Sequence, residues 1–281
     1  MTQIKHTKWL VVTDLDGTLL NHHDYTVNHA LPAIKKLQEL NIPVIFNTSK
    51  TFIESISLQN QLGIKAPFIV ENGSCIYFPK SLYLELVVNE KKRSRDQYWE
   101  IILGKSHSEI SNILKNIDTP ASYYQLLSTC SAKQASDLTG LNIAQAKQAI
   151  SRDFSEPLLW QACEKDLAIF TKQLEEHNLN TLQGGRFLHV LGNCDKGIAT
   201  NKLKEILLMQ EIKPDTQIKT IVLGDSANDA AMLQTGDISI IVNSPSNHPL
   251  LKIVTPYIHT DHEAPYGWAN AIEAVLIKIK E

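Results

Sequence analysis

The stretch VVTDLDGT, residues 11–18, ends a short apolar run with two aspartates placed two positions apart. The run at residues 9–12 is rich in strand-forming side chains, and Gly17 lets the chain turn sharply after the acids. Open α/β sheets bind their ligands at the carboxyl ends of the strands. We therefore expect Asp14 and Asp16 at the ligand-binding edge of a parallel sheet.

Two carboxylates at a strand end can divide the work of phosphoryl transfer. One can attack phosphorus to form an aspartyl-phosphate, while the other donates and then accepts a proton. The Thr18 hydroxyl can brace the loop that carries them. The alternative is a solvated acidic turn, but D-x-D-G-T arises by chance only about once in several hundred chains of this length.

A second acidic pair lies in GDSAND, residues 224–229, which follows another apolar run and opens a helix. Taken alone, Asp225 or Ser226 can serve as a helix cap. Combined with the first pair, these acids form a cluster of oxygen ligands without suitably spaced His or Cys, which favours Mg²⁺ over zinc. The predicted metal ligands are Asp14, Asp16, Asp225 and Asp229.

Phosphoryl transfer also needs hydrogen-bond donors for the phosphoryl oxygens. NTSKT, residues 47–51, offers Thr48, Ser49 and backbone amides at the start of a helix, which is a natural anion site. Lys196 begins another helix and adds a positive charge. A single lysine is usually exposed to solvent, so its significance comes from its place in the series acidic pair, Thr/Ser, Lys, acidic pair.

Strands alternate with helices at both ends of the chain, which favours an α/β fold with a Rossmann-like parallel sheet. Expected strands cover residues 9–12, 42–46, 67–70, 84–88, 98–103, 123–128, 158–161, 187–191, 218–223 and 238–242. Expected helices cover residues 28–40, 52–62, 106–117, 142–152, 163–178, 195–210, 227–234 and 264–279. The charged run 89–97 is expected to be a solvated connection. We predict a catalytic core of residues 1–83 and 190–281, with an inserted α+β cap domain at 84–189.

Composition limits the classes of function. The chain has 281 residues, 43% of them hydrophobic, and a net charge of −3, which argues against disorder and against broad electrostatic attraction to nucleic acid. The four cysteines are widely spaced and form no CxxC pair, so we expect reduced thiols in a cytoplasmic protein. We expect no signal peptide and no membrane span. The oligomeric state is left open.

The ordered series DLDGT, strand-end Thr/Ser, Lys196 and GDSAND resembles the haloacid dehalogenase superfamily of phosphatases. That resemblance implies that Asp14 is the nucleophile and Asp16 the general acid and base. It also implies that Thr48 and Lys196 hold the phosphoryl group. Asp225 would ligate Mg²⁺ together with Asp14, and Asp229 would assist.

Further motifs narrow the resemblance. SKT (49–51), ENGS (71–74), DLTGL (137–141), DFSEP (153–157), GGRF (184–187), GDSAND (224–229) and YGW (266–268) occur in this order. Over nearly the whole chain they resemble the family of mannosyl-3-phosphoglycerate phosphatases, which implies a glycosylated 3-phosphoglycerate as substrate. Three departures, at Ser74, Ala227 and APYGW, spare the acids but leave the sugar open.

The predicted substrate-binding residues are Ser49, Lys50, Arg186 and Trp268. The cations suit the anionic groups of a phosphoglycerate, and an indole suits a sugar face. Alternatively, Trp268 anchors the terminal helix and Arg186 pairs with an acid of the cap. Glu156 either positions a turn or accepts sugar hydroxyls, and His189 in an apolar run is expected to be a core residue.

Other functions stay open at this point. The same acids could hydrolyse glucosyl-3-phosphoglycerate or another sugar phosphate. A phosphotransferase would pass the aspartyl-phosphate to an acceptor, and a non-catalytic Mg²⁺ or phospholigand sensor would keep only the scaffold.

Overall fold

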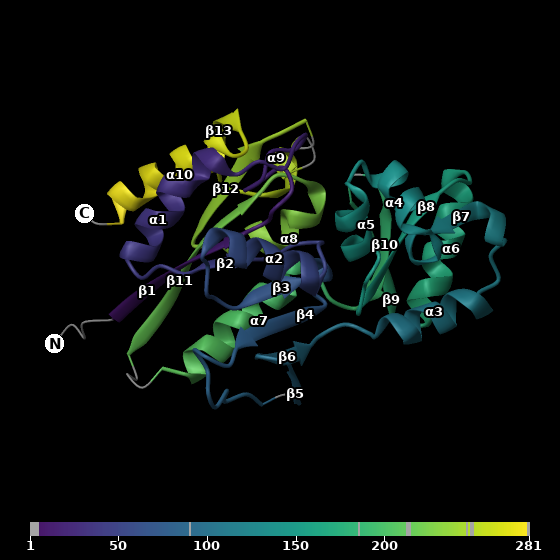
Figure 1. The fold of residues 1–281 in the computed structure, drawn as a ribbon, viewed down its shortest axis with the longest axis horizontal. Coiled ribbons are helices and arrows are strands. Elements are labelled where there is room, and N and C mark those ends of the chain that lie inside the picture. Colours follow the sequence, from purple (N-terminus) through teal and green to yellow (C-terminus); the bar gives the residue numbers. More distant parts are fainter. Residues whose placement is uncertain are drawn as a thin grey trace.

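The structure is a computed structural model that describes residues 6–89, 91–184, 186–211, 215–245, 247 and 250–279. Gly185 of the GGRF motif lies outside the described residues. The chain folds into a larger lobe built on a parallel sheet and a smaller lobe formed by its middle part (Figure 1). The expected α/β class is confirmed.

The larger lobe is organised by a five-stranded parallel sheet in the order β13-β12-β11-β1-β2. Its strands are β1 (His6–Thr13), β2 (Val44–Phe46), β11 (Thr216–Gly224), β12 (Ile238–Asn243) and β13 (Ile258–Glu263). Thr13 pairs with Leu223 of β11 on one side and with Phe46 of β2 on the other. The carboxyl ends of β2, β1 and β11 therefore meet at one edge of the sheet.

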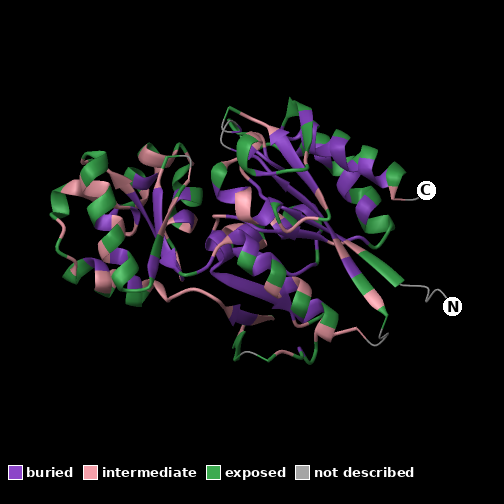
Figure 2. Cartoon of the chain, turned by 180° about the vertical axis from the view of Figure 1, so that it is seen from behind, coloured by how far each residue is buried: buried purple, intermediate pink, exposed green. Residues whose placement is uncertain are grey.

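Helices cover this sheet, and buried residues lie on the strands and on the helix faces turned toward them (Figure 2). They are α1 (Leu31–Glu39), α2 (Phe52–Leu62), α7 (Lys196–Met209), α8 (Ala230–Leu233), α9 (Leu250–Ile253) and α10 (Tyr266–Lys278), with the 3-10 turns η1 (Asn28–Ala30), η2 (Glu71–Gly73) and η5 (Ala227–Asp229). The start of α2 is fixed by a capping box, in which the Thr51 and Glu54 side chains each accept the other's backbone N–H. This places residues 48–50 in a defined turn at the sheet edge.

A second, antiparallel sheet extends the larger lobe. Its order is β3 (Phe68–Val70), β4 (Cys75–Pro79), β6 (Tyr98–Ile102) and β5 (Lys92–Arg95). A bridge between Asn47 and Ile69 joins this sheet to the end of β2. Stacked and tilted rings of Phe52, Phe68 and Tyr77 pack between α2 and the sheet.

The smaller lobe, called the cap below, has its own antiparallel sheet in the order β7 (Tyr124–Leu126), β8 (Ser155–Trp160), β10 (Leu188–Gly192) and β9 (Leu179–Gln183). Its helices are α3 (His107–Asn116), α4 (Ala132–Thr139), α5 (Ile143–Ala149) and α6 (Glu164–Glu176), with turns η3 (Ala121–Tyr123) and η4 (Leu127–Thr129). Apolar side chains including Ile110, Phe170 and Val190 form a separate buried cluster there.

The two chain segments that join the lobes lie against each other. A Cβ atom built on Gly192 would stand 2.7 Å from the Lys105 nitrogen and 3.0 Å from the Gly104 Cα. Gly192 therefore has to be glycine for the segments to approach this closely.

One strand prediction is wrong and one connection was misread. Residues 84–88 form no strand, and Leu84 is 81% exposed. The run 89–97, predicted to be a solvated connection, contains β5 among its described residues. An edge strand with mostly exposed side chains needs no apolar alternation, so charged residues conceal it.

Five further helices and strands are not predicted by the sequence patterns: β4, α4, β9, α9 and β13. Only one residue of β13, Thr260, is buried, so this edge strand shows no apolar pattern. β4 differs, because CIYFP is a continuous buried apolar run of the kind that indicates an internal strand.

The strand pairings bear on the limits of the cap. β6 pairs with β4 and β5, whereas β10 pairs with β8 and β9. We propose that the inserted domain is best taken as residues 104–192, in place of the predicted 84–189.

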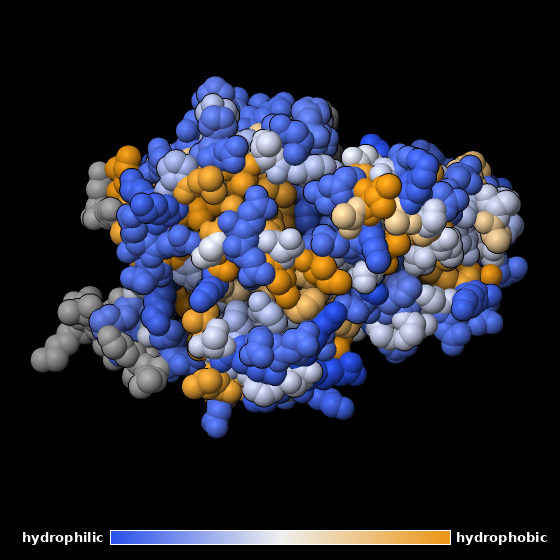
Figure 3. Space-filling view, viewed as in Figure 1, coloured by the Kyte–Doolittle hydropathy of each residue, from blue (hydrophilic) through white to orange (hydrophobic). Residues whose placement is uncertain are grey.

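None of the described helices is long and apolar enough to cross a membrane. The face shown in Figure 3 is largely hydrophilic, with apolar patches on the larger lobe. One cavity of about 560 Å³ lies at the amino end of the parallel sheet, lined by apolar residues such as Trp9 and Ile42. Glu211, the carboxylate among its described lining residues, is paired with Lys8 at 2.6 Å, so those residues offer no free acid for catalysis.

Candidate active site

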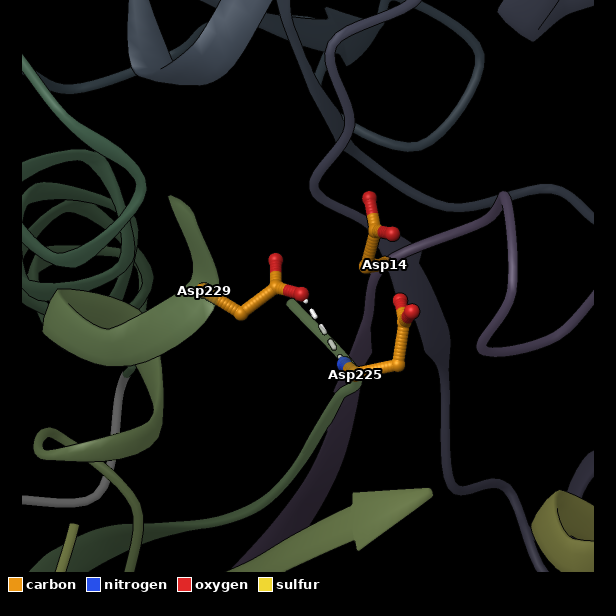
Figure 4. Close-up of side chains that lie close together, drawn as sticks. All are labelled: Asp14, Asp225 and Asp229. Carbon is orange, nitrogen blue, oxygen red and sulfur yellow. Dashed lines mark hydrogen bonds between the residues drawn. The ribbon is translucent and has the colours of Figure 1, made fainter. Parts of the chain in front are cut away.

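Three aspartates come together at the carboxyl ends of the two central strands. Asp14 directly follows β1 and donates its backbone N–H to the Leu223 carbonyl at 3.0 Å. Asp225 directly follows β11, and Asp229 ends the η5 turn. One carboxylate oxygen from each lies within 4.8 Å of the others, and the three side chains gather around one space (Figure 4).

Lys196 is the cation of this cluster. It is the first residue of α7, is fully buried, and donates to Asp14 Oδ1 at 2.6 Å and to Asp229 Oδ1 at 2.7 Å. Burial alone would lower the pKa of Lys196, but the charges of Asp14 and Asp229 outweigh it and raise the pKa. The lysine is therefore held as an ammonium ion.

The acids carry more charge than Lys196 can balance. Burial raises the pKa of Asp14 well above its usual value, and repulsion from Asp229 and Asp225 adds to this against the attraction of Lys196. Burial and the charge of Asp229 raise the pKa of Asp225 to about 7. With all three carboxylates ionised, the single ammonium would leave two negative charges for a cation to balance, and all the ligand atoms are oxygens. This donor set fits Mg²⁺.

Hydrogen bonds fix the orientation of Asp225. Thr18 Oγ1 donates to its Oδ1 and Ser244 Oγ to its Oδ2, both at 2.9 Å. Gly17 has φ +81°, and a Cβ there would stand 2.7 Å from Asp225 Oδ2. Glycine at this position thus permits both the turn and the close approach of the carboxylate. Thr18 was expected to brace its own loop, and its hydroxyl instead contacts Asp225 of the second acidic motif.

Further polar residues support the cluster and were not singled out from sequence. Asn47 Nδ2 donates to the Lys196 carbonyl at 2.8 Å, which ties the end of β2 to the start of α7. Asn247 Nδ2 donates to the Asp225 carbonyl at 2.7 Å and its Oδ1 accepts from Ser244 N. The sequence offers only a weak indication of these two asparagines, namely that each follows a buried strand whose carboxyl end reaches this edge of the sheet.

Asp16 lies apart from the three clustered acids. Its Oδ2 is 2.9 Å from Lys50 Nζ, and its buried Oδ1 has no hydrogen-bond partner among the described residues. Lys50 also lies 3.8 Å from Glu54 Oε1 and 5.2 Å from the centre of the Tyr25 ring. Burial would lower the pKa of Lys50, but Asp16 and Glu54 raise it. A substrate anion reaching Lys50 would share this cation with Asp16.

A cavity of about 550 Å³ between core and cap contains these groups. Its walls include Asp14, Asp16, His22, Tyr25, Ser49, Lys50, Glu54, Arg152, Arg186, Phe187, His189, Asp225 and Asn228. Three predicted substrate residues, Ser49, Lys50 and Arg186, thus face the same space as the acids. Thr48 is fully buried behind it, and its hydroxyl accepts the Lys50 N–H at 3.1 Å.

The predicted sugar contact at Trp268 is wrong. The indole is fully buried in the core, and its Nε1 donates to Thr13 Oγ1 at 3.0 Å. It anchors α10 beneath β1, which was the alternative interpretation. Arg186 is exposed and donates to the Leu138 carbonyl, so its partner within the cap is a backbone oxygen.

Two further cap residues have clear environments. Glu156 is fully buried and accepts from Ser128 N at 3.1 Å, while its other oxygen lies 2.8 Å from His107 Nε2. It therefore positions the turn before α4. His189 lines the cavity, and burial together with the charges of Arg152 and Lys196 lowers its pKa to about 3.

Comparison with known proteins agrees with this geometry. The family model of haloacid dehalogenase-like hydrolases matches residues 11–272. The chain belongs to this family. It is 36% identical over 268 residues to a glucosyl-3-phosphoglycerate/mannosyl-3-phosphoglycerate phosphatase of Methanococcoides burtonii, covering 94% of this chain and 96% of the relative. A protein of the same description from Persephonella marina is 32% identical over 272 residues, covering 96% and 98%.

Solved structures share the fold. A haloacid dehalogenase-like hydrolase from B. subtilis superposes with a TM-score of 0.62 at 18% identity, covering 94% of this chain and 98% of that one. The sucrose-phosphatase of Synechocystis, in complex with sucrose and phosphate, gives a TM-score of 0.61 at 17% identity, covering 95% and 97%. The chain is therefore a haloacid dehalogenase-like hydrolase in both sequence and fold, and its named relatives are phosphatases.

Proposed function

We propose that this hydrolase is a Mg²⁺-dependent phosphatase of glycosyl-3-phosphoglycerates, which it cleaves to the glycosylglycerate and phosphate. The observation that carries the proposal is the buried cluster of Asp14, Asp225, Asp229 and Lys196, opening into a cavity that also holds Asp16 and cations of the cap. The substrate class is supported by the two relatives, whose description includes both the mannosyl and the glucosyl compound.

The cluster supplies the ligands for the metal. Asp14, Asp225 and Asp229 would hold Mg²⁺, and the side chain of Asp16 would stay outside this set, paired with Lys50. The ion's charge would offset the repulsion between these acids and the incoming phosphate. Thr18 and Ser244 would keep Asp225 oriented in the meantime.

The covalent chemistry falls to Asp14 and Asp16. An Asp14 carboxylate oxygen attacks phosphorus, the bond from phosphorus to the glycerate oxygen breaks, and Asp16 gives its proton to that leaving oxygen. Asp16 then takes a proton from water, whose oxygen attacks the aspartyl-phosphate phosphorus and releases phosphate with the Asp14 carboxylate restored. Lys196 holds Asp14 in place and balances charge on the phosphoryl group, with Thr48 as the second predicted holder of that group.

The cap closes the cavity and contacts the rest of the substrate. Ser49 and Lys50 from the core and Arg186 from the cap face the space beyond the acids. A cytoplasmic location is part of the proposal, because all four cysteines are free thiols.

The test is phosphate release in Mg²⁺ from mannosyl-3-phosphoglycerate, glucosyl-3-phosphoglycerate and glucose 6-phosphate. We expect both glycosyl-3-phosphoglycerates to be hydrolysed well above the hexose phosphate, and we expect EDTA or Asp14→Asn to abolish turnover. Near-normal turnover by Asp14→Asn would refute the mechanism, whereas a preference for glucose 6-phosphate would refute only the proposed substrate class. Transfer of phosphate to an added acceptor alcohol would identify a phosphotransferase instead.

A further inference from the structure

Glu71, from the ENGS turn of the core, binds residues 152–155 of the cap. Its carboxylate is fully buried and its backbone φ is +49°, an uncommon conformation for a residue other than glycine. It accepts from Asp153 N at 2.9 Å, Phe154 N at 3.2 Å and Ser155 Oγ at 2.6 Å, and lies 3.4 Å from Arg152 Nε. One core carboxylate thus binds four consecutive cap residues.

These contacts of Glu71 place Arg152 beside the active site. Its side chain is only 5% exposed, and it lines the cavity that contains Asp14 and Asp16. Its Nε donates to Ser155 Oγ at 2.9 Å, Nη1 to the Ala149 carbonyl at 3.2 Å and Nη2 to the Ser49 carbonyl.

These bonds do not use all of the guanidinium. Arginine has five N–H donors, and the three bonds leave one N–H on each terminal nitrogen of Arg152 without a partner among the described residues. Unpaired donors on a nearly buried cation are costly, so a ligand in the cavity is the natural partner. With one free N–H on each terminal nitrogen, the guanidinium can donate to both oxygens of a carboxylate.

We propose that Arg152 binds the glycerate carboxylate of the substrate, and that Glu71 is the positioning residue that holds Arg152 for this contact. The assignment rests on the proposed function, since it takes the carboxylate from that substrate class. The other cavity cations fit the role less well. Lys50 is engaged by Asp16 and Glu54, and Arg186 is exposed at the rim.

This arrangement links recognition to closure of the cap. Arg152 belongs to the cap, yet it contacts the core at both Ser49 and Glu71. It reaches its position only when the cap is docked on the core. A substrate with a carboxylate at the right place therefore favours the closed form, and a phosphate ester without one does not.

The experiment compares two ligands that differ at a single group. 3-Phosphoglycerate carries a carboxylate where glycerol 3-phosphate carries a hydroxymethyl group. Binding of each is measured by calorimetry in Mg²⁺ to the Asp14→Asn protein, which cannot turn over. We expect 3-phosphoglycerate to bind more tightly, and Arg152→Gln to weaken it about ten- to a hundredfold while changing glycerol 3-phosphate less than about twofold.

Arg95→Gln is the matched control. Arg95 Nη1 binds Asp153 Oδ2 at 2.6 Å, so it restrains the same cap segment, but it does not line the cavity. We expect it to leave the preference for 3-phosphoglycerate intact. Glu71→Gln should reduce that preference, and the reduction should vanish when Arg152 is already Gln, as for a residue that acts through Arg152.

Arg152→Lys provides a second variant in case Arg152→Gln does not fold, because it keeps the charge and removes the fork. An unchanged preference in whichever variant folds overturns the assignment, as does an equal loss for both ligands or a loss of preference in Arg95→Gln. Failure to hydrolyse glycosyl-3-phosphoglycerates would overturn the proposed function separately. An Arg152-dependent preference for 3-phosphoglycerate would survive that result.

Discussion

Replacing Lys196 by methionine tests the charge balance at the base of the active site. The ammonium is fully buried and bridges Asp14 and Asp229 at 2.6 and 2.7 Å. Removing one partner of a buried ion pair costs about 3–5 kcal/mol, because the remaining charge has neither water nor a counter-ion. We expect Lys196→Met to lower the free energy of unfolding by about that amount in EDTA at pH 8.

The control is Lys50→Met. Lys50 pairs with Asp16 at 2.9 Å, but the two side chains are 13% and 37% exposed, so solvent screens the pair. Its removal should cost about 1 kcal/mol or less. Urea denaturation followed by tryptophan fluorescence measures both variants, since Trp268 is fully buried beneath β1.

A double variant tests whether charge imbalance causes the loss of stability. Asp14→Asn in the Lys196→Met background removes one of the unpaired carboxylates and should restore more than half of the lost stability. Equal losses for Lys196→Met and Lys50→Met, or a double variant less stable than Lys196→Met alone, would show that charge imbalance is not the cause.

Two shorter predictions concern the loop at Asp14 and the cap. Gly17→Ala places a Cβ against Asp225 and should reduce the Mg²⁺ affinity at least about tenfold. The control is Gly63→Ala, at φ +62° with open space around it, which should cost about 1 kcal/mol of stability without changing kcat. Equal kcat and equal metal affinity in the two variants would contradict this. The hydrogen bond to Glu156 raises the pKa of His107, so its stabilisation is complete below the unfolded value of about 6.5 and is lost as pH rises through the folded pKa. The melting temperature of the cap should therefore fall as pH rises above about 6.5, and this fall should be shallower in His107→Gln. An unchanged slope would refute the assignment.

Helices and strands could be predicted from sequence where their buried residues form an apolar run or a periodic apolar pattern. β1 and β11 are apolar runs that end in acids, so both strands and the acids at their carboxyl ends could be located from sequence, whereas their pairing is seen only in the structure. β5 and β13 could not be found in this way, because their mostly exposed side chains show no apolar alternation.

The same distinction applies to the site. Asp14, Asp225, Asp229 and Lys196 could be selected from motif spacing, and the structure brings them together. Arg152 could not, since its significance depends on contacts with distant core residues that no local pattern encodes.

The predicted sugar contact at Trp268 is wrong because it relied on the aromatic side chain alone. An indole near the end of a chain is equally suited to cover a sugar or to fill a core. The burial of the indole and its hydrogen bond to Thr13 decide between them. Its hydrogen bond to Thr13 also places it directly behind the strand that carries Asp14.

The close approach of Gly104 and Gly192 has a consequence for engineering. Because the two ends of the cap are neighbours in space, a linker of a few residues could close the gap if the domain between them were deleted. The same geometry would allow caps from relatives to be exchanged as whole modules on one catalytic base. A short tether from Gly104 to Gly192 would thus give a minimal hydrolase whose activity toward small, unselective phosphate esters reports the chemistry of the core alone.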